Sequence, residues 1–228
     1  MKCTKCQSSN KIKAGFARER QRYKCKDCGY FFSVEKKSDV KTLEQKRLAL
    51  EMYLEGLGFR AIGRLLNISY GTVYQWVKKW GESVELPKNE VPIEIVELDE
   101  IHSYVQHKKT TVGAGIAVDR LRKRFISFNL WTNGTQKPSL KLWEQLKTEY
   151  KCFFVSDYWK NYSELIPSER HVTSKAETFT VEGYNSRIRH YLARFKRKTK
   201  CYSKSKTMLE NSLKLLFLKL NNELNIII

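Results

Sequence analysis

Four cysteines near the start of the chain have the spacing of a tetrahedral metal site. They form two Cys-x-x-Cys pairs, Cys3 with Cys6 and Cys25 with Cys28, separated by 18 residues. Each pair presents two thiolates on one turn, and two such turns supply the four ligands of a structural zinc ion. The pattern predicts a zinc ribbon over residues 1–38 with one Zn²⁺. A pair of disulfides is the alternative, and it belongs to oxidising compartments.

Three acidic residues farther along the chain are placed to bind divalent cations. We expect Asp99 to end a strand, Asp157 to follow a short apolar strand, and Glu182 to lie in the first turn of a late helix. Carboxylates from separate elements suit two cations about 4 Å apart, which activate the attacking oxygen and stabilise the leaving oxygen of a phosphoryl displacement. Mg²⁺ or Mn²⁺ suits this task because both prefer carboxylate and phosphate oxygens.

The charge of the chain indicates a polyanionic partner. Its 228 residues include 43 Lys and Arg against 24 Asp and Glu, for a formal net charge of +19. Nucleic acid is the commonest partner of such a protein. Residues 82–100 are the exception, with seven acidic residues and one basic residue. We interpret this acidic segment as a charged linker at its start and as part of a metal site at Asp99.

Composition excludes two broad classes of protein. Hydrophobic residues make up 41% of the chain and aromatic residues 12%, which is enough for a packed core and excludes wholesale disorder. No run of 18 apolar residues occurs, and the first six residues have no apolar segment. We therefore expect a soluble intracellular protein without a membrane span or a secretory signal.

Residues 41–81 have the pattern of three short helices. A leucine-rich stripe ends at Gly56, and Ser69 is placed to cap a last helix that begins at Tyr70. This plan is typical of a helix-turn-helix domain, in which the last helix enters the major groove of DNA. An ordinary three-helix bundle is the alternative. The outward residues expected to contact DNA are Tyr70, Thr72, Tyr74, Gln75, Lys78 and Lys79. Among them, the amide of Gln75 suits hydrogen bonds to a base edge, and the ammonium groups of Lys78 and Lys79 suit contacts with phosphates.

After a linker at residues 82–92, the pattern changes from helices to alternating strands. The order is strand, hairpin, helix, strand, strand, helix, and it fits a ribonuclease-H-like mixed α/β domain over residues 93–228. We expect strands at 93–100, 111–119, 124–131, 152–155 and 170–173, and helices at 138–150 and 180–197. Together with the ribbon and the three helices, this gives a multi-domain α+β protein.

The whole arrangement resembles the transposases of the insertion-sequence-one family. A zinc ribbon, a helix-turn-helix and a D-D-E core follow one another in that order, and the resemblance runs from Cys3 to about Ser205. The local strings that carry it are Leu98-Asp99-Glu100, Ser156-Asp157-Tyr158, Glu177 to Asn185, Arg187 to His190, Leu192 to Thr199 and Ser203-Lys204-Ser205.

The resemblance implies an enzyme that binds the terminal inverted repeats of its element, hydrolyses a phosphodiester there and joins the free 3′-hydroxyl to target DNA. Asp99, Asp157 and Glu182 would be its catalytic metal ligands. Arg189 lies seven residues after Glu182, on the same helix face as Asn185, and would contact DNA near the reacting phosphate. Further DNA contacts would come from Arg187, Arg194, Lys196, Arg197 and Lys198, although a solvated basic face is the alternative for the last four.

The family also implies partners and a location. We expect double-stranded DNA, both element ends and target, as the partner, and a homodimer or higher oligomer on that DNA. The protein would work in the prokaryotic cytoplasm, associated with the nucleoid. Two alternatives stay open: a non-enzymatic zinc-ribbon and helix-turn-helix regulator, and a metal-dependent nuclease without strand transfer.

Several other residues are expected to serve structure. Glu100 would point to the face of its strand opposite Asp99. The histidines at 102, 107 and 171 have no partner spacing, and Cys152 and Cys201 lack the spacing of metal ligands. The leucines from Leu209 to Leu224 recur at helical spacing and predict a packing surface.

Overall fold

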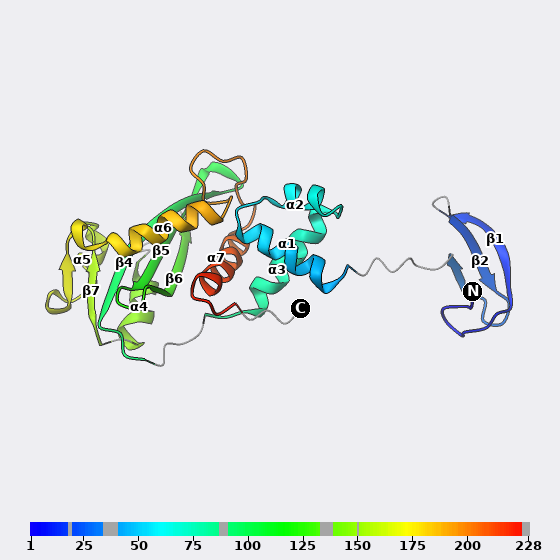
Figure 1. Ribbon diagram of the computed structural model, residues 1–228, viewed down its shortest axis with the longest axis horizontal. Coiled ribbons are helices and arrows are strands. Elements are labelled where there is room, and N and C mark those ends of the chain that lie inside the picture. The colour runs from blue at the N-terminus through cyan, green and yellow to red at the C-terminus, as the bar shows by residue number, and fades with distance from the viewer. Residues whose placement is uncertain (18–19, 34–40, 87–90, 133–138, 150, 225–228) are drawn as a thin grey trace. The chain divides into compact units, whose positions relative to one another are not determined.

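The computed structural model divides the chain into two compact units, Met1–Thr42 and Leu43–Ile228 (Figure 1). None of the described helices is long and apolar enough to cross a membrane. The structure describes residues 1–17, 20–33, 41–86, 91–132, 139–149 and 151–224.

The first unit is a small antiparallel sheet in the order β1-β2-β3. Its strands are β1 (Lys11–Ala17), β2 (Arg20–Cys25) and β3 (Phe31–Ser33). Its buried hydrophobic cluster consists of Cys3, Cys25 and Phe32, with Tyr23 and Cys28 packed against it. So few apolar residues supply little folding free energy, and a metal ion held by the four cysteines would supply much of it.

The larger unit begins with the three helices that the sequence predicts. They are α1 (Leu43–Leu54), α2 (Phe59–Leu65) and α3 (Tyr70–Ser83). The Ser69 hydroxyl accepts a hydrogen bond from the Gly71 N–H at 3.2 Å, which confirms the predicted N-cap. Gly56 has φ +88°, a conformation that suits glycine in the turn that ends α1.

A five-stranded sheet follows, in the order β6-β5-β4-β7-β8. The first three strands pair antiparallel, and β7 and β8 run parallel to β4. This confirms the predicted strand, hairpin and later strands. The bounds are β4 (Ile95–Val105), β5 (His107–Asp119), β6 (Arg124–Thr132), β7 (Phe153–Ser156) and β8 (His171–Thr173).

The prediction that Asp99 ends the first strand is wrong. β4 continues to Val105 because β5 pairs with it residue by residue as far as Tyr104. Inward-facing Ile101 and Val105 keep the alternation going beyond Glu100. Asp99 therefore lies inside a long strand.

Helices cover both faces of this sheet (Figure 1). Leu142 and Leu146 of α4 (Leu140–Glu149) and Tyr162 of α5 (Lys160–Ser163) pack in one cluster with Leu98 of β4. The helices α6 (Phe179–Tyr191) and α7 (Lys206–Leu220) pack in the other cluster with the opposite side of β4 and β5. Two short 3-10 turns, η1 (Ser168–Arg170) and η2 (Lys175–Glu177), lie near β8.

The prediction that the late helix runs to Arg197 is also wrong. The helix α6 ends at Tyr191, and Leu192 has an extended backbone. Leu192, Ala193 and Phe195 are buried, so the chain turns to bring these apolar side chains into the core. The basic residues Arg194, Lys196, Arg197 and Lys198 therefore lie beyond the helix.

The C-terminal leucines form a packing surface, as the sequence predicts. Leu209, Leu213 and Leu216 of α7 are fully buried in the cluster that also contains α1 and α3. A Cβ at Gly81 of α3 would lie 2.3 Å from the Asn211 Cβ, so the two helices approach at a glycine. The division between domains 41–81 and 93–228 stays a prediction, and part of the linker at 82–92, residues 87–90, is outside the described residues.

Candidate functional site

The four N-terminal thiols lie close enough together to hold one metal ion. All four sulfur atoms lie within 4.8 Å of one another. The Sγ atoms of Cys3 and Cys28 are 3.6 Å apart, as are those of Cys6 and Cys25. Sulfurs around a tetrahedral zinc ion are about 3.8 Å apart, whereas a disulfide bond is about 2.05 Å long. The geometry fits zinc and does not fit two disulfides.

Local contacts favour the ionised state of Cys3 but not of Cys6, whose pKa the neighbouring thiols and burial raise to about 12. Burial opposes ionisation of Cys3, but the backbone N–H groups of Cys6 and Lys5 and the neighbouring thiols lower its pKa to about 7. Asp27 links the two Cys-x-x-Cys turns, because it accepts hydrogen bonds from Ser8 and from Asn10, the latter at 2.9 Å. A thiolate is the form that binds zinc.

The sheet register brings two of the predicted carboxylates together. The strands β4 and β7 pair in parallel up to Leu98 and Ser156. The next residues along the chain are Asp99, still within β4, and Asp157, directly after β7. The Asp157 carboxylate accepts a hydrogen bond from the Trp159 N–H at 3.0 Å, which fixes the loop after β7.

The third carboxylate lies on α6, which packs across β4. Glu182 is exposed in the first turn of this helix, as the sequence predicts. One helical turn later, the Asn185 amide donates a hydrogen bond of 2.7 Å to Asp99. Arg189 lies on the same helix, close enough to Asp99 and Arg197 for both to influence its pKa, which burial lowers. The helix thus carries three polar side chains, Glu182, Asn185 and Arg189, toward Asp99.

The electrostatics of this cluster favour a bound cation. Burial raises the pKa of Asp99, and the negative charges of Asp157 and Glu182 raise it further, while the hydrogen bonds from Glu100 N–H and Asn185 lower it. The buried Asn185 Oδ1 has no hydrogen-bond partner within the described part of the chain. An unsatisfied oxygen beside mutually repelling carboxylates fits divalent metal ions and their bound water. These carboxylates are nevertheless gathered less tightly than the four thiols, which are the one such group found among the described residues.

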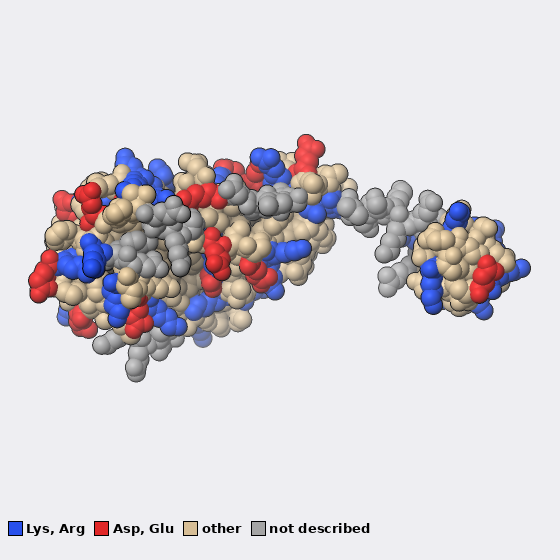
Figure 2. All heavy atoms as spheres, turned by 90° about the horizontal axis from the view of Figure 1, so that it is seen from below, with Lys and Arg blue, Asp and Glu red and all other residues tan. Residues whose placement is uncertain are grey.

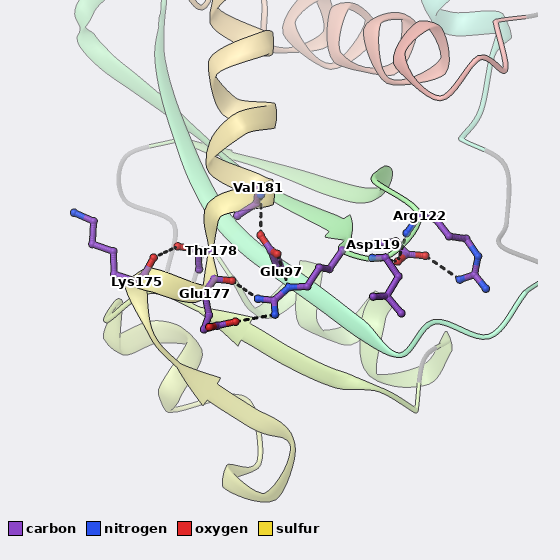
Figure 3. A network of polar contacts seen from close by, with 9 residues as sticks. Glu97, Asp119, Arg122, Lys175, Glu177, Thr178 and Val181 are labelled. Carbon is purple, nitrogen blue, oxygen red and sulfur yellow. Dashed lines mark hydrogen bonds and ion pairs between the residues drawn. The ribbon is translucent and has the colours of Figure 1, made fainter.

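A buried ion-pair network holds the start of α6 (Figure 3). Glu97 is fully buried, and its carboxylate accepts hydrogen bonds from Arg120 Nε at 2.6 Å and from the Val181 N–H at 2.8 Å. Arg120 also pairs with Glu177 at 2.8 Å. Thr178, the N-cap residue, makes no side-chain cap hydrogen bond. Glu97 therefore takes the place of an N-cap side chain, because it accepts from the N–H of Val181, the residue before Glu182.

Sequence reasoning missed Glu97 as a site residue. The signal was an acidic side chain at an inward position of an alternating strand, between Val96 and Leu98. A carboxylate at such a position needs a buried partner, because an unpaired buried charge is strongly destabilising.

Glu100 points away from Asp99, as strand alternation predicts, but it is largely buried. Burial raises the pKa of Glu100 to about 8. The fully buried Tyr162 lies close to it, and burial and the nearby Glu100 raise the pKa of this phenol. Neither Glu100 Oε1 nor the Tyr162 hydroxyl has a hydrogen-bond partner of good geometry among the described residues.

The last helix of the three-helix region presents only part of the predicted DNA-binding set. Tyr70, Gln75 and Lys79 are exposed, and Thr72 is half-buried. Tyr74 instead packs edge-on against the Phe59 ring at 5.5 Å. Lys78 forms an exposed ion pair with Glu82 at 3.7 Å.

The basic residues near the end of α6 also divide into two groups. Arg187, Lys196, Arg197 and Lys198 are exposed. Arg194 is not, because its Nε donates to the Tyr53 hydroxyl at 2.9 Å and its guanidinium lies 4.3 Å from the Phe59 ring centroid. The structure thus gives Arg194 a packing contact in place of an open basic face.

Two of the three histidines that precede α6 have hydrogen-bond partners. His171 Nε2 lies 2.9 Å from the Ser156 Oγ, and His107 Nδ1 lies 3.0 Å from the Thr110 Oγ1. His102 lies edge-on to Trp131, with ring centroids 6.3 Å apart. These contacts agree with structural roles.

Comparisons with known proteins match both parts of the larger unit. The sequence profile of the IS1 transposase family matches residues 93–221, and that of a homeodomain-like domain matches residues 41–88. The curated relatives include the insertion element IS1 4 protein InsB of Escherichia coli (strain K12), 32% identical over 109 residues. That alignment covers 48% of this chain and 65% of the relative.

A second relative matches over the same number of residues. The insertion element IS1 protein InsB of Shigella flexneri is 29% identical over 109 residues, which cover 48% of this chain and 82% of that protein. The chain thus spans 65% of the length of the first relatives that it matches. Among solved structures, an intasome of simian T-cell lymphotropic virus in complex with PP2A regulatory subunit B56 gamma has a TM-score of 0.37 at 14% identity, over 81% of this chain and 70% of that chain, and supports no conclusion.

Proposed function

Because the chain belongs to the IS1 transposase family, we propose that it is a D-D-E transposase that cuts DNA at the ends of its element and joins those ends to target DNA. The observation that carries this proposal is the parallel register of β4 and β7, which makes Asp99 and Asp157 neighbours beneath the helix that holds Glu182. Three antiparallel strands followed by two parallel ones also support a ribonuclease-H-like catalytic domain.

The proposed chemistry is phosphoryl transfer at these three carboxylates. Two Mg²⁺ or Mn²⁺ ions bound there would supply activation of the attacking oxygen and stabilisation of the leaving oxygen. Asn185 holds the Asp99 carboxylate in place through its 2.7 Å hydrogen bond. Arg189, which interacts electrostatically with Asp99, would bind the phosphate that reacts. Glu97 fixes the first turn of α6 and with it the approach of Glu182.

DNA binding would be divided among separate elements. The exposed Gln75 and Lys79 of α3 suit a base edge and a phosphate, respectively. The ribbon would bind one structural Zn²⁺ through its four thiols. Joining two element ends in one reaction requires two catalytic sites, so we propose that a dimer or higher oligomer assembles on the DNA.

A strand-transfer assay with purified protein tests this function. The substrate is a duplex that carries the terminal repeat of the element, with Mg²⁺ or Mn²⁺ and a target plasmid. We expect joined products from the wild-type chain and from Glu164→Gln, which changes an exposed carboxylate next to α5, and none from Asp157→Asn.

The two alternative functions give different outcomes. Equal product from the wild type and Asp157→Asn would remove Asp157 from the catalytic set. Cleavage without joining would identify a nuclease, and specific binding without any cleavage would identify a regulator.

A further inference from the structure

The hairpin that joins β4 to β5 extends beyond the last residue of β4 that pairs with β7. Within the described residues, β7 pairs with β4 only as far as Leu98, and β6 pairs with β5 only from Val112 onward. The two strands continue to pair with each other up to Tyr104 and Thr111. Residues 104–111 form the two-stranded tip of this hairpin, and its first strand, β4, is the one that holds Asp99.

The chain that follows α6 is attached to this tip. The Gln106 N–H donates to the Ser203 carbonyl at 2.7 Å, and Val105 forms a parallel bridge with Ser203. The Tyr104 and Tyr202 rings meet edge to face, with centroids 5.3 Å apart. Figure 1 shows the segment after α6 looping beside the end of the hairpin. We call the hairpin tip and residues 193–206 together the basic ridge.

The basic ridge contains no carboxylate. Residues 193–206 include seven Lys and Arg, residues 104–111 include two Lys, and neither segment has an Asp or Glu. Its exposed cations are Lys108, Lys109, Lys196, Arg197, Lys198, Lys200, Lys204 and Lys206.

The cations of the ridge are not neutralised within the protein. None of them takes part in an ion pair within the described residues, whereas Arg120, Arg122, Arg124 and Lys219 elsewhere in the unit are all paired. Asp and Glu also lie among Lys and Arg on the face shown in Figure 2. A concentrated positive charge without internal partners attracts an external polyanion.

The basic ridge is continuous with the carboxylate site. Arg197 lies near enough to lower the pKa of Arg189, and Arg189 in turn lies near Asp99. On its other side the ridge reaches the turn after α1, since a Cβ at Gly56 would lie 3.3 Å from Lys196 Nζ. The ridge therefore extends from the proposed reaction centre toward the three-helix region.

The chemistry of the surface identifies the kind of partner. None of the exposed large hydrophobic side chains of the described residues lies on the ridge. A protein partner or a lipid surface would normally require apolar contacts, but a phosphate backbone requires only cations. We infer that the basic ridge binds the phosphate backbone of duplex DNA next to the reacting phosphate, independently of base sequence. This inference rests on the proposed function, since it names where that DNA is held.

The experiment replaces the hairpin lysines, which the sequence analysis did not predict to bind DNA. Binding of Lys108→Ala/Lys109→Ala is measured against salt concentration on the element-end duplex and on an unrelated duplex. Since each phosphate contact contributes about 0.9 to the slope of log K against log salt, the double variant should lose about two units of slope. Its affinity at low salt should fall about tenfold or more, equally on both duplexes.

Matched variants control for folding and for total charge. Lys141→Ala/Lys147→Ala removes two exposed lysines of α4, which packs on the face of the sheet opposite to α6. This variant should bind DNA with nearly the wild-type slope of log K against log salt. Both double variants should unfold at the wild-type temperature, because the four side chains are exposed.

The outcomes separate this inference from the proposed function. If the wild type joins DNA and the hairpin variant keeps the wild-type slope, the ridge is not a DNA-binding surface. A loss confined to the element-end duplex would also overturn the inference, because it would indicate base reading. If the hairpin variant loses slope but the wild type joins no DNA under any metal condition, the ridge stands and the transposase proposal fails.

Discussion

The two proposed metal sites of this chain are built in opposite ways. The four thiols converge to within 4.8 Å, but among the described residues of the unit around them the buried cluster consists of only Cys3, Cys25 and Phe32. Asp99 lies within a five-stranded sheet that is covered by helices on both faces, and Asp157 directly follows one of its strands, yet these carboxylates are gathered less closely.

The difference distinguishes a metal ion that would stabilise the fold from metal ions that would bind to a fold that is already stable. In a small unit, binding free energy is folding free energy, so the ligands have to be close and complete. In a large unit the core fixes the backbone, and catalytic carboxylates stay open because water and phosphate complete the coordination.

The largest expected effect is the loss of the ribbon on zinc removal. Chelation, or Cys25→Ser, should unfold Met1–Thr42 and leave the unfolding temperature of Leu43–Ile228 unchanged, because the four thiols all lie in the smaller unit. Zinc content by atomic absorption and amide hydrogen exchange in each unit measure this.

Cys201→Ser is the matched control, since it replaces an exposed cysteine outside the thiol cluster. It should retain one zinc per chain. Full zinc content and normal protection of β1–β3 in Cys25→Ser would contradict the comparison.

The second effect is on activity without any effect on folding. Glu182 is exposed on α6, so Glu182→Gln should keep the wild-type unfolding temperature. Strand transfer should fall about a hundredfold or more, equivalent to about 2.7 kcal/mol of barrier, since a metal ligand is lost. A variant that joins DNA at the wild-type rate would exclude Glu182 from the site.

Local patterns in the sequence predicted much of this fold. Period-two alternation predicted the strands, and the Cys-x-x-Cys spacing predicted the thiol cluster, because both signals are read from neighbouring residues. The full length of β4 was missed because pairing with β5, a partner distant in sequence, extends it to Val105. The end of α6 was missed because burial of Leu192 and Phe195, and not helix propensity, sets it.

The polar residues around the carboxylates were harder to predict than the carboxylates themselves. Asp99 and Asp157 follow recognisable apolar runs, whereas the roles of Glu97 and Arg194 depend on contacts with Val181 and Tyr53. Such contacts join segments more than 80 residues apart, and no local pattern specifies them.

The third effect tests how the core positions the carboxylate site. Glu97→Ala leaves Arg120 without its buried partner and the first turn of α6 without an acceptor, and should destabilise the larger unit by about 3 kcal/mol or more. Glu97→Gln keeps an oxygen for the Val181 N–H, so it should cost less. Chemical denaturation gives the free energies of unfolding, and hydrogen exchange at Val181 reports the first turn. Equal stability of the two variants would show that the acceptor for Val181 contributes nothing.

The smallest effect concerns the buried acid on the other face of β4. Burial raises the pKa of Glu100 from 4.5 to about 8, so between these values the unfolded chain releases a proton that the folded chain keeps. The contribution of this group to the free energy of unfolding is therefore largest below pH 4.5 and decreases as the pH rises toward 8. Glu100→Gln removes the titration, so its stability relative to the wild type should rise from pH 5 to pH 8, by thermal unfolding without divalent cations. Glu164→Gln, which changes an exposed carboxylate, should show no such trend, and a pH-independent difference for Glu100→Gln would mean that Glu100 is ionised in the folded protein.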